Sequence, residues 1–170
     1  SAWRLDLVAR ETTLDGAGNR LREFRHAYDL NGNRERTETW LDREDRYIVS
    51  LRQRFDSFGN VIETIDARES RRKIQFDTLL HAWPVTETIH LGASDLVMTA
   101  EYDFGLGVVT RATDFHGQRT DYRHDALGRQ VEQLRPGGAG ELYEFHFGNP
   151  VSHMIKRLRL EPSPAGGATF

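Results

Sequence analysis

A six-residue phrase recurs along this chain. It starts with an aromatic residue or histidine followed by aspartate, and it ends with glycine and a polar residue. Clear copies occupy 28–33, 55–60 and 124–129, and looser copies occupy 14–19, 102–107 and 113–118. A short unit used in series buries its apolar face only against its neighbours. The repeat therefore indicates a scaffold rather than a catalyst.

The segments between the phrases alternate in polarity. Tyr47–Phe55 has Tyr47, Val49, Leu51 and Phe55 on one face and Ser50, Arg52 and Arg54 on the other, and Glu141–Phe147 alternates likewise. A period of two residues is typical of half-buried β-strands. We therefore expect strands rather than helices.

Each phrase is expected to form the turn between two strands. Glycine supplies the positive φ of a tight hairpin, and the aspartate can accept hydrogen bonds from the amides of the turn. The expected turn residues are Asp15, Gly18, Asp29, Gly32, Asn33, Asp56, Gly59, Asn60, Asp103, Asp114, Gly117, Asp125, Gly128 and Arg129. The predicted fold is all-β: serial antiparallel β-hairpins that form a twisted, curved sheet.

Four other segments carry predictions. Asp77 heads a degenerate unit without glycine, and Pro84 suits the start or the edge of a strand because it lacks a donor. Leu41–Arg46 is the best candidate for one helical turn. Residues 136–140 are expected to be a flexible loop. We assign residues 1–160 to one sheet domain and 161–170 to a loose tail.

Composition excludes several classes of function. The net charge of −3 gives no reason to expect nucleic acid, and the absence of cysteine excludes disulfides and thiolate chemistry. No apolar run approaches the ~18 residues that a membrane span needs. All but two of the 23 basic residues are arginine, scattered among carboxylates, which indicates a salt-bridged sheet surface. The start at Ser1, without a leader pattern, suggests an excised fragment.

Metal sites are possible but poorly supported. Residues 29–33 alternate oxygen ligands, yet an EF-hand loop would need glycine sixth and glutamate twelfth, and counting from Asp29 the twelfth residue is Trp40. The seven histidines form no ligand motif. We expect an Asx-type turn and packing or surface histidines, with no metal and no cofactor.

Catalytic constellations are equally weak. The carboxylate pairs Asp42/Asp45 and Asp121/Asp125 could serve glycoside hydrolysis in principle, but each also belongs to a turn or a charged face. No serine lies in a nucleophile elbow, and Gly16–Gly18 lacks the third glycine of a phosphate loop. We expect no enzymatic activity. An alternative function is carbohydrate or protein binding, with Trp3, Trp40 and Trp83 stacking on a sugar.

The repeats resemble those of the YD-repeat, or Rhs, family. The resemblance spans roughly residues 10–150 and is strongest over 102–137, which contains the run Asp125-Ala-Leu-Gly-Arg129. Such repeats wind a β-sheet into a hollow shell, which in bacterial Rhs and toxin-complex proteins encloses a cytotoxic cargo; teneurins are more distant members. This chain is too short to close a shell and lacks the Asp-Pro-rich self-cleaving segment of the bacterial members.

The resemblance implies a structural role. It predicts a secreted or cell-surface parent protein, to whose shell this segment contributes wall, with the rest of that shell and an enclosed toxin domain as partners. Rings expected to line a concave face are Tyr28, Phe55, Phe76, Tyr102 and Tyr122. Because isolated sheets have unpaired edges, we also expect a homo-oligomer formed through these edges.

Overall fold

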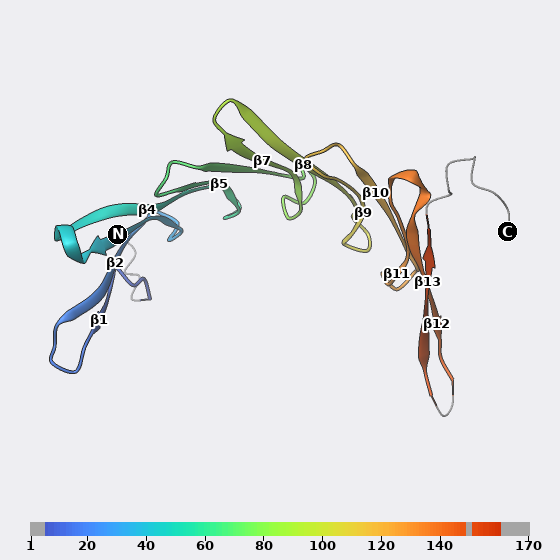
Figure 1. Cartoon of the computed structure of the whole chain (residues 1–170), viewed down its shortest axis with the longest axis horizontal. Coiled ribbons are helices and arrows are strands. Elements are labelled where there is room, and N and C mark those ends of the chain that lie inside the picture. The colour runs from blue at the N-terminus through green and yellow to red at the C-terminus, as the bar shows by residue number, and fades with distance from the viewer. Residues whose placement is uncertain (1–5, 149–150, 161–170) are drawn as a thin grey trace, which may run out of the picture. The chain divides into compact units, whose positions relative to one another are not determined.

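The computed structural model describes residues 6–148 and 151–160 (Figure 1). The prediction of an all-β fold is confirmed. The strands are β1 (Arg10–Leu14), β2 (Arg20–Tyr28), β3 (Arg34–Leu41), β4 (Arg46–Phe55), β5 (Val61–Asp66), β6 (Arg71–Phe76), β7 (Pro84–Leu91), β8 (Ser94–Asp103), β9 (Val108–Thr113), β10 (Arg119–His124), β11 (Gln130–Leu134), β12 (Gly140–His146) and β13 (His153–Arg159).

The strand order in the sheet follows the order of the chain, from β1 to β13. Pairing is antiparallel, as between β2 and β3 or β12 and β13, so consecutive strands form hairpins. Pro84 opens β7, a position where its missing N–H costs least. Local pairing of this kind needs only short connections, which the repeat supplies.

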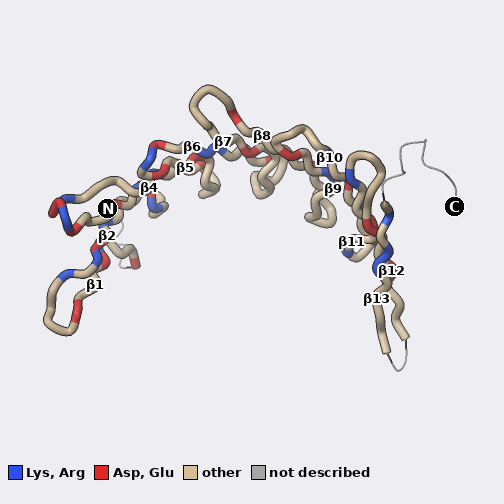
Figure 2. Tube along the Cα trace, viewed as in Figure 1, with Lys and Arg blue, Asp and Glu red and all other residues tan. Residues whose placement is uncertain are grey.

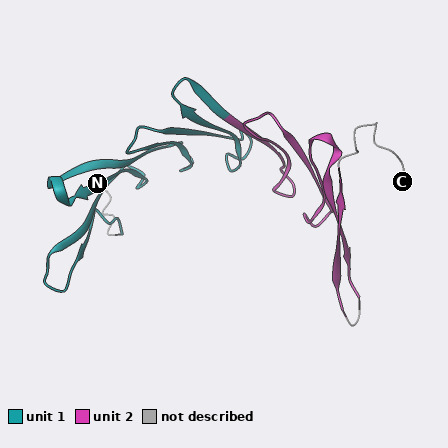
Figure 3. Cartoon of the chain, viewed as in Figure 1, with its two compact units in different colours: residues 1–96 teal, residues 97–170 magenta. Residues whose placement is uncertain are grey.

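The chain divides into two compact units, residues 1–96 and 97–170 (Figure 3). The first unit holds β1 to β7 and the start of β8, and the second holds the rest of β8 and β9 to β13. Each unit consists of hairpins in a single layer. The predicted tail at 161–170 lies outside the described residues.

Neither unit has an apolar core. No hydrophobic side chain is buried within 6–148 and 151–160, and the buried polar or charged residues are Glu23, Thr37, Glu63 and Asp77. Leu30 is 99% exposed and Leu127 76%. A sheet normally covers its apolar face with another layer. These hairpins bury no apolar side chain in the described ranges, so backbone ladders, turns and ion pairs must hold them together.

The short helical segments differ in part from expectation. The predicted turn at Leu41–Arg46 contains the 3-10 helix η1 (Asp42–Glu44). Residues 136–140 are not simply a loop, because Pro136–Gly138 forms the 3-10 helix η2 and the buried Gly140 begins β12. No helix in the described part of the chain has the length and apolar character to cross a membrane.

The predicted apolar face of β4 is wrong. The register shifts at Ser50, since Val49 pairs with Glu38 whereas Leu51 pairs with Thr37. Neighbouring positions of β3 face opposite sides, so Val49 and Leu51 do too. The bulge therefore separates Tyr47 and Val49 from Leu51.

Candidate functional site

All but one of the repeat aspartates head a turn of the same geometry. In 56–60, the Asp56 amide donates to the Asn60 carbonyl and the Gly59 amide donates to the Asp56 carbonyl. One carboxylate oxygen of Asp56 accepts the amides of Phe58 and Asn60 at 2.9 Å each. The register shifts by one residue beside this turn, between Arg54 and Phe55, as in a G1-bulge hairpin. We call this arrangement the aspartate turn.

The same bonds recur at five further places. The aspartate turns are 15–19, 29–33, 56–60, 66–70, 114–118 and 125–129. In five of them the fourth residue is a glycine with positive φ, from 75° at Gly117 to 88° at Gly32. In 66–70 that residue is Glu69, with φ of 62°.

The fifth residue explains the polar end of the phrase. Asn33 donates through Nδ2 to the second oxygen of Asp29 at 2.9 Å, and Arg129 donates through Nε to Asp125 at 2.7 Å. These bonds, with those from the turn amides, hold the pKa of Asp29 and Asp125 below the usual value for aspartate. Both carboxylates are therefore charged, which strengthens the hydrogen bonds that they accept.

Asp103 heads a different turn. The Gly107 amide donates to the Asp103 carbonyl at 2.8 Å, and the carboxylate accepts the amides of Gly105 and Leu106. The loop is thus closed by one bond across five residues rather than by the pair of bonds at Asp56. Asp103 belongs to the hairpin turns, but not to the aspartate-turn class.

Asp77 makes the densest set of amide bonds among the aspartates. Its two oxygens accept five backbone amides at 2.6–3.2 Å, from Leu79, Leu80, His81, Ala82 and Trp83. Burial raises the pKa of Asp77, but these five donors outweigh it and the pKa falls well below normal. The unit that the sequence marks as degenerate is a longer loop organised by one buried carboxylate.

Neighbouring turns also contact one another. Asn60, which closes one aspartate turn, donates through Nδ2 to the carbonyl of His81 at 2.6 Å. The Phe58 ring stacks on His81 with centroids 4.0 Å apart. The Asp56 turn and the Asp77 loop are thereby linked, so turn residues connect successive hairpins as well as reversing the chain.

Sequence reasoning missed the turn at Asp66. Asp66-Ala-Arg-Glu-Ser70 differs from Asp125-Ala-Leu-Gly-Arg129 mainly in having glutamate where glycine is expected. This turn could have been found from an aspartate followed four residues later by a polar residue, even though the glycine is absent. Glu69 also pairs with Arg52 at 3.0 Å.

A second missed feature is a charged cluster on one face of unit 1, which we call the Glu23 cluster: Arg10, Arg20, Glu23, Arg25 and Tyr47. Glu23 is fully buried, with Arg10 at 2.7 Å, Arg20 at 3.4 Å and Arg25 at 3.5 Å from its carboxylate. The Tyr47 hydroxyl also donates to it. Arg25 lies over the Tyr47 ring at 3.6 Å.

These contacts change the acidity of both groups. The hydrogen bond from Tyr47, with those from Arg10 and Arg20, lowers the pKa of Glu23 to about 2 against the effect of burial. The same bond raises the pKa of Tyr47. Figure 2 shows both signs of charge interspersed along the strands, as the scattered arginines predicted.

The aromatic residues offer no open stacking platform at Trp40. Arg20 lies over its ring at 3.6 Å, and its indole N–H donates to Asp45 at 3.1 Å. Trp83 is half-buried and Trp3 lies outside the described residues. The five rings predicted to line a concave face are half-buried, and that lining role stays a prediction: Tyr28, Phe55, Phe76, Tyr102 and Tyr122.

Candidate metal and catalytic groups are not gathered. No group of three or more His, Asp or Glu side chains able to hold a metal occurs in the described ranges. Asp29 is engaged by its own turn, and Asp121 is bound by Arg111 at 2.9 Å and Arg119 at 2.8 Å. These carboxylates are part of turns and ion pairs.

The fold defines a class: a series of antiparallel hairpins closed by aspartate turns. Neither a family model nor a curated protein sequence matches this chain. Solved structures of toxin-complex proteins are similar to it. They include TcdB2–TccC3 with Cdc42, with a TM-score of 0.63 and 14% identity over 88% of this chain.

Two further structures are similar to a like degree. TcdB2–TccC3 without its hypervariable C-terminal region gives a TM-score of 0.65 at 16% identity, and a Photorhabdus luminescens Tc holotoxin pore with a mutated TccC3 gives 0.65 at 15%. Each covers 91% of this chain. This chain spans 9% of the length of the three matched chains. At such identity the likeness shows the fold alone.

Proposed function

We propose that this chain is a structural YD-repeat segment of a larger Rhs- or toxin-type protein and contributes wall to a β-shell. One observation carries the proposal. Hairpins closed by aspartate turns, without a buried apolar side chain in the described ranges, are similar in fold to part of the TcdB2–TccC3 chains over 88–91% of this chain. A sheet without its own core gains stability when further layers or strands cover it.

The mechanism is mechanical. Backbone ladders supply stiffness along the sheet, and the aspartate turns fix the pitch of each hairpin. Ion pairs tie adjacent strands across their faces: Arg111 of β9 reaches Glu101 of β8 at 2.8 Å and Asp121 of β10 at 2.9 Å. Such rows hold neighbouring strands in register without apolar packing.

The proposal assigns this segment no catalysis, metal or cofactor. The carboxylates most shifted in pKa, Glu23 and Asp77, are saturated by hydrogen bonds from the protein, which supports a structural use. The partners are then the rest of the parent shell and an enclosed toxin domain, and the parent is secreted or on the cell surface, as the family resemblance implies.

The test is the structure of the natural protein that contains this segment, determined by electron cryomicroscopy. We expect β1 and β13 to pair with strands outside 6–160 and the sheet to surround an interior volume. A sheet that pairs with no further strands and encloses no interior volume would contradict the proposal.

Resistance of the enclosed chain to protease provides a functional test. In the natural protein, Asp77→Ala removes the acceptor of five amides and should expose enclosed chain to protease. Asp42→Ala, at an exposed position of η1, is the matched control and should leave protection unchanged. Equal protection in both variants would count against a wall role for this segment.

A further inference from the structure

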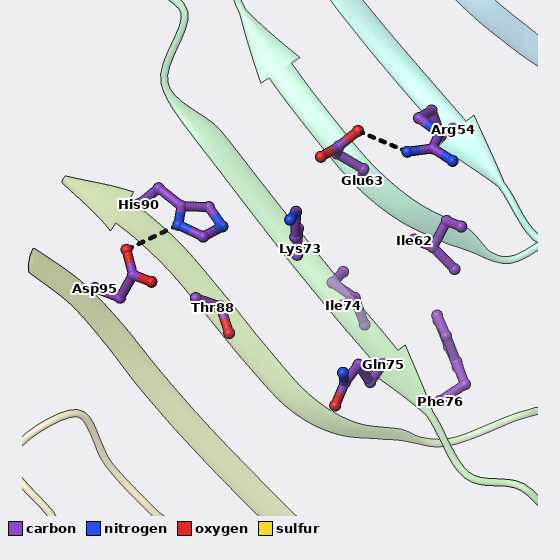
Figure 4. Close-up of a pocket in the computed structure, with 10 residues that line it drawn as sticks. All are labelled: Arg54, Ile62, Glu63, Lys73, Ile74, Gln75, Phe76, Thr88, His90 and Asp95. Atoms are coloured by element: carbon purple, nitrogen blue, oxygen red, sulfur yellow. Dashed lines mark hydrogen bonds and ion pairs between the residues drawn. The ribbon is translucent and has the colours of Figure 1, made fainter. Parts of the chain in front are cut away.

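One face of unit 1 is hollowed over β5, β6 and β7 (Figure 4). The pocket has a volume of about 610 Å³, within the range of small-ligand sites. Beside the apolar Ile62, Ile74 and Phe76, its lining holds these charged and polar groups: Arg54, Glu63, Lys73, Gln75, Thr88, His90 and Asp95.

Strand register explains why these groups meet. Lys73 of β6 lies opposite Glu63 of β5 and Thr88 of β7, and Arg71 lies opposite His90. Positions two residues apart share a face, so both rows point to the same side of the sheet. In Figure 4, Lys73 lies between the His90–Asp95 pair and the Glu63–Arg54 pair.

Two groups in this pocket lack partners. The Lys73 ammonium makes no ion pair or hydrogen bond with the described residues, although Glu63 opposite is approached by Arg54 and Arg71 at 3.5 Å each. Nε2 of His90 is buried and has no hydrogen-bond partner. Buried polar atoms are nearly always paired, so an orphaned one needs an explanation.

The His90–Asp95 pair determines what Nε2 can do. Nδ1 lies 2.8 Å from Oδ1 of Asp95, and since a carboxylate only accepts, Nδ1 carries the proton. Nε2 can then donate to a ligand only when the ring is an imidazolium. An anionic oxygen would supply the acceptor and favour that charged state.

The acidic residues do not oppose an anion here. Glu63 is faced by two guanidinium groups, and Asp95 by the His90 ring. The charged groups around His90 are Arg71 and Lys73 from β6, Glu63 from β5 and Asp95 from β8. Lys73 adds a cation that forms no ion pair in the described part of the chain, although Glu63 lies opposite it on β5.

We propose that this pocket binds an oxyanion, a carboxylate or phosphate group, between the Lys73 ammonium and Nε2 of His90. The inference goes beyond the wall function and does not depend on it.

The test is an NMR titration of the 15N-labelled chain with succinate and with inorganic phosphate, observing the His90 ring. Saturable shifts of the His90 signals with either probe are expected. The affinity should weaken at least tenfold in Lys73→Met, read from the His90 signals, and in His90→Phe, read from the backbone amide signals of β6 and β7. Lys156→Met is the matched control, because Lys156 is the other lysine of the chain and pairs with Glu141 at 3.0 Å. It should leave binding unchanged.

The two probes distinguish the ligand source: saturation by succinate alone assigns a carboxylate, and saturation by phosphate alone assigns a phosphate. The inference is overturned if neither probe saturates, or if Lys73→Met binds as well as the wild type with its amide spectrum intact.

Discussion

At the residue scale, the fourth position of the aspartate turn shows whether backbone strain or lack of space requires a glycine there. A Cβ at Gly59 would meet only Oδ1 of Asn33, at 3.9 Å, so space is available, but φ is +86°. Gly59→Ala is therefore expected to cost about 1–2 kcal/mol through left-handed strain alone. Thermal or urea unfolding of the chain measures this difference.

Glu69 supplies the matched control. It occupies the same position of the 66–70 turn with φ of 62°, so its strain is already present. Glu69→Ala should lose only the exposed pair with Arg52, so its loss of stability should be smaller than that of Gly59→Ala. Equal losses of stability in Gly59→Ala and Glu69→Ala would show that positive φ is not the reason for glycine at this position.

Glu23 predicts an acid-sensitive stability. Its pKa is about 2 in the folded chain, against an ordinary value of 4.5. Between these values the unfolded chain binds a proton that the folded chain does not, so stability falls as pH drops from about 4.5 to about 2. In Glu23→Gln, unfolding free energy measured by urea titration at several pH values should vary less over this window. An unchanged slope would contradict this role of Glu23.

The turn roles of glycine and asparagine could be predicted from residue types alone, because the backbone conformation of a tight turn depends mainly on its own residues. Asp66 was missed because Glu69 hides the glycine signal. Glu23 was missed for another reason: Tyr47, which binds it, is 24 residues away. Contacts across strands depend on register, which a period-two pattern does not fix.

At the element scale, the start of β12 shows a close backbone approach. A Cβ on Gly140 would lie 2.2 Å from the carbonyl oxygen of Gln133 on β11, a distance that requires the strands to move. Gly140→Ala should destabilise the β11–β12 hairpin by about 1–3 kcal/mol. Hydrogen exchange of the β11 and β12 amides measures the local loss.

The control for this prediction is Gly16→Ala. Nothing lies within 4 Å of a Cβ there, so little change in stability is expected. If Gly140→Ala were equally silent, the two strands would not approach as closely as the backbone indicates. The sequence places Gly140 in a glycine-rich stretch that looks like a loop, and only pairing with Leu134 and Arg159 reveals a strand.

The bulge at Ser50 is a similar case. Alternation in 47–55 predicts a strand correctly but assigns Leu51 to the wrong face, because one unpaired residue reverses the phase. Ser50 donates to the Thr37 carbonyl at 3.2 Å and accepts from Thr39 at 2.8 Å. These bonds stabilise the bulge, and neither is visible in the local pattern.

At the scale of the whole molecule, the fold class could be predicted because every local signal agrees: alternation, turn residues and the repeat all favour hairpins. The absence of an apolar core among the described residues could not be predicted, since 38% hydrophobic residues is compatible with ordinary globular folding. Burial depends on what covers a sheet, and that is not encoded in the strand pattern.

Exposed apolar residues on the terminal strand β13 predict self-association of the isolated chain. Met154 and Leu158 are 53% and 68% exposed, and their spacing puts them on one face of a strand at the edge of the sheet. Met154→Glu with Leu158→Glu should therefore shift sedimentation velocity profiles toward the monomer at a given concentration.

Leu30→Glu, at a turn tip that is 99% exposed, is the control and should leave the distribution unchanged. If the control disrupts association as strongly, the contact is a general apolar one rather than an edge contact. A wild-type chain that stays monomeric at high concentration would show that a lone edge strand of this composition does not pair.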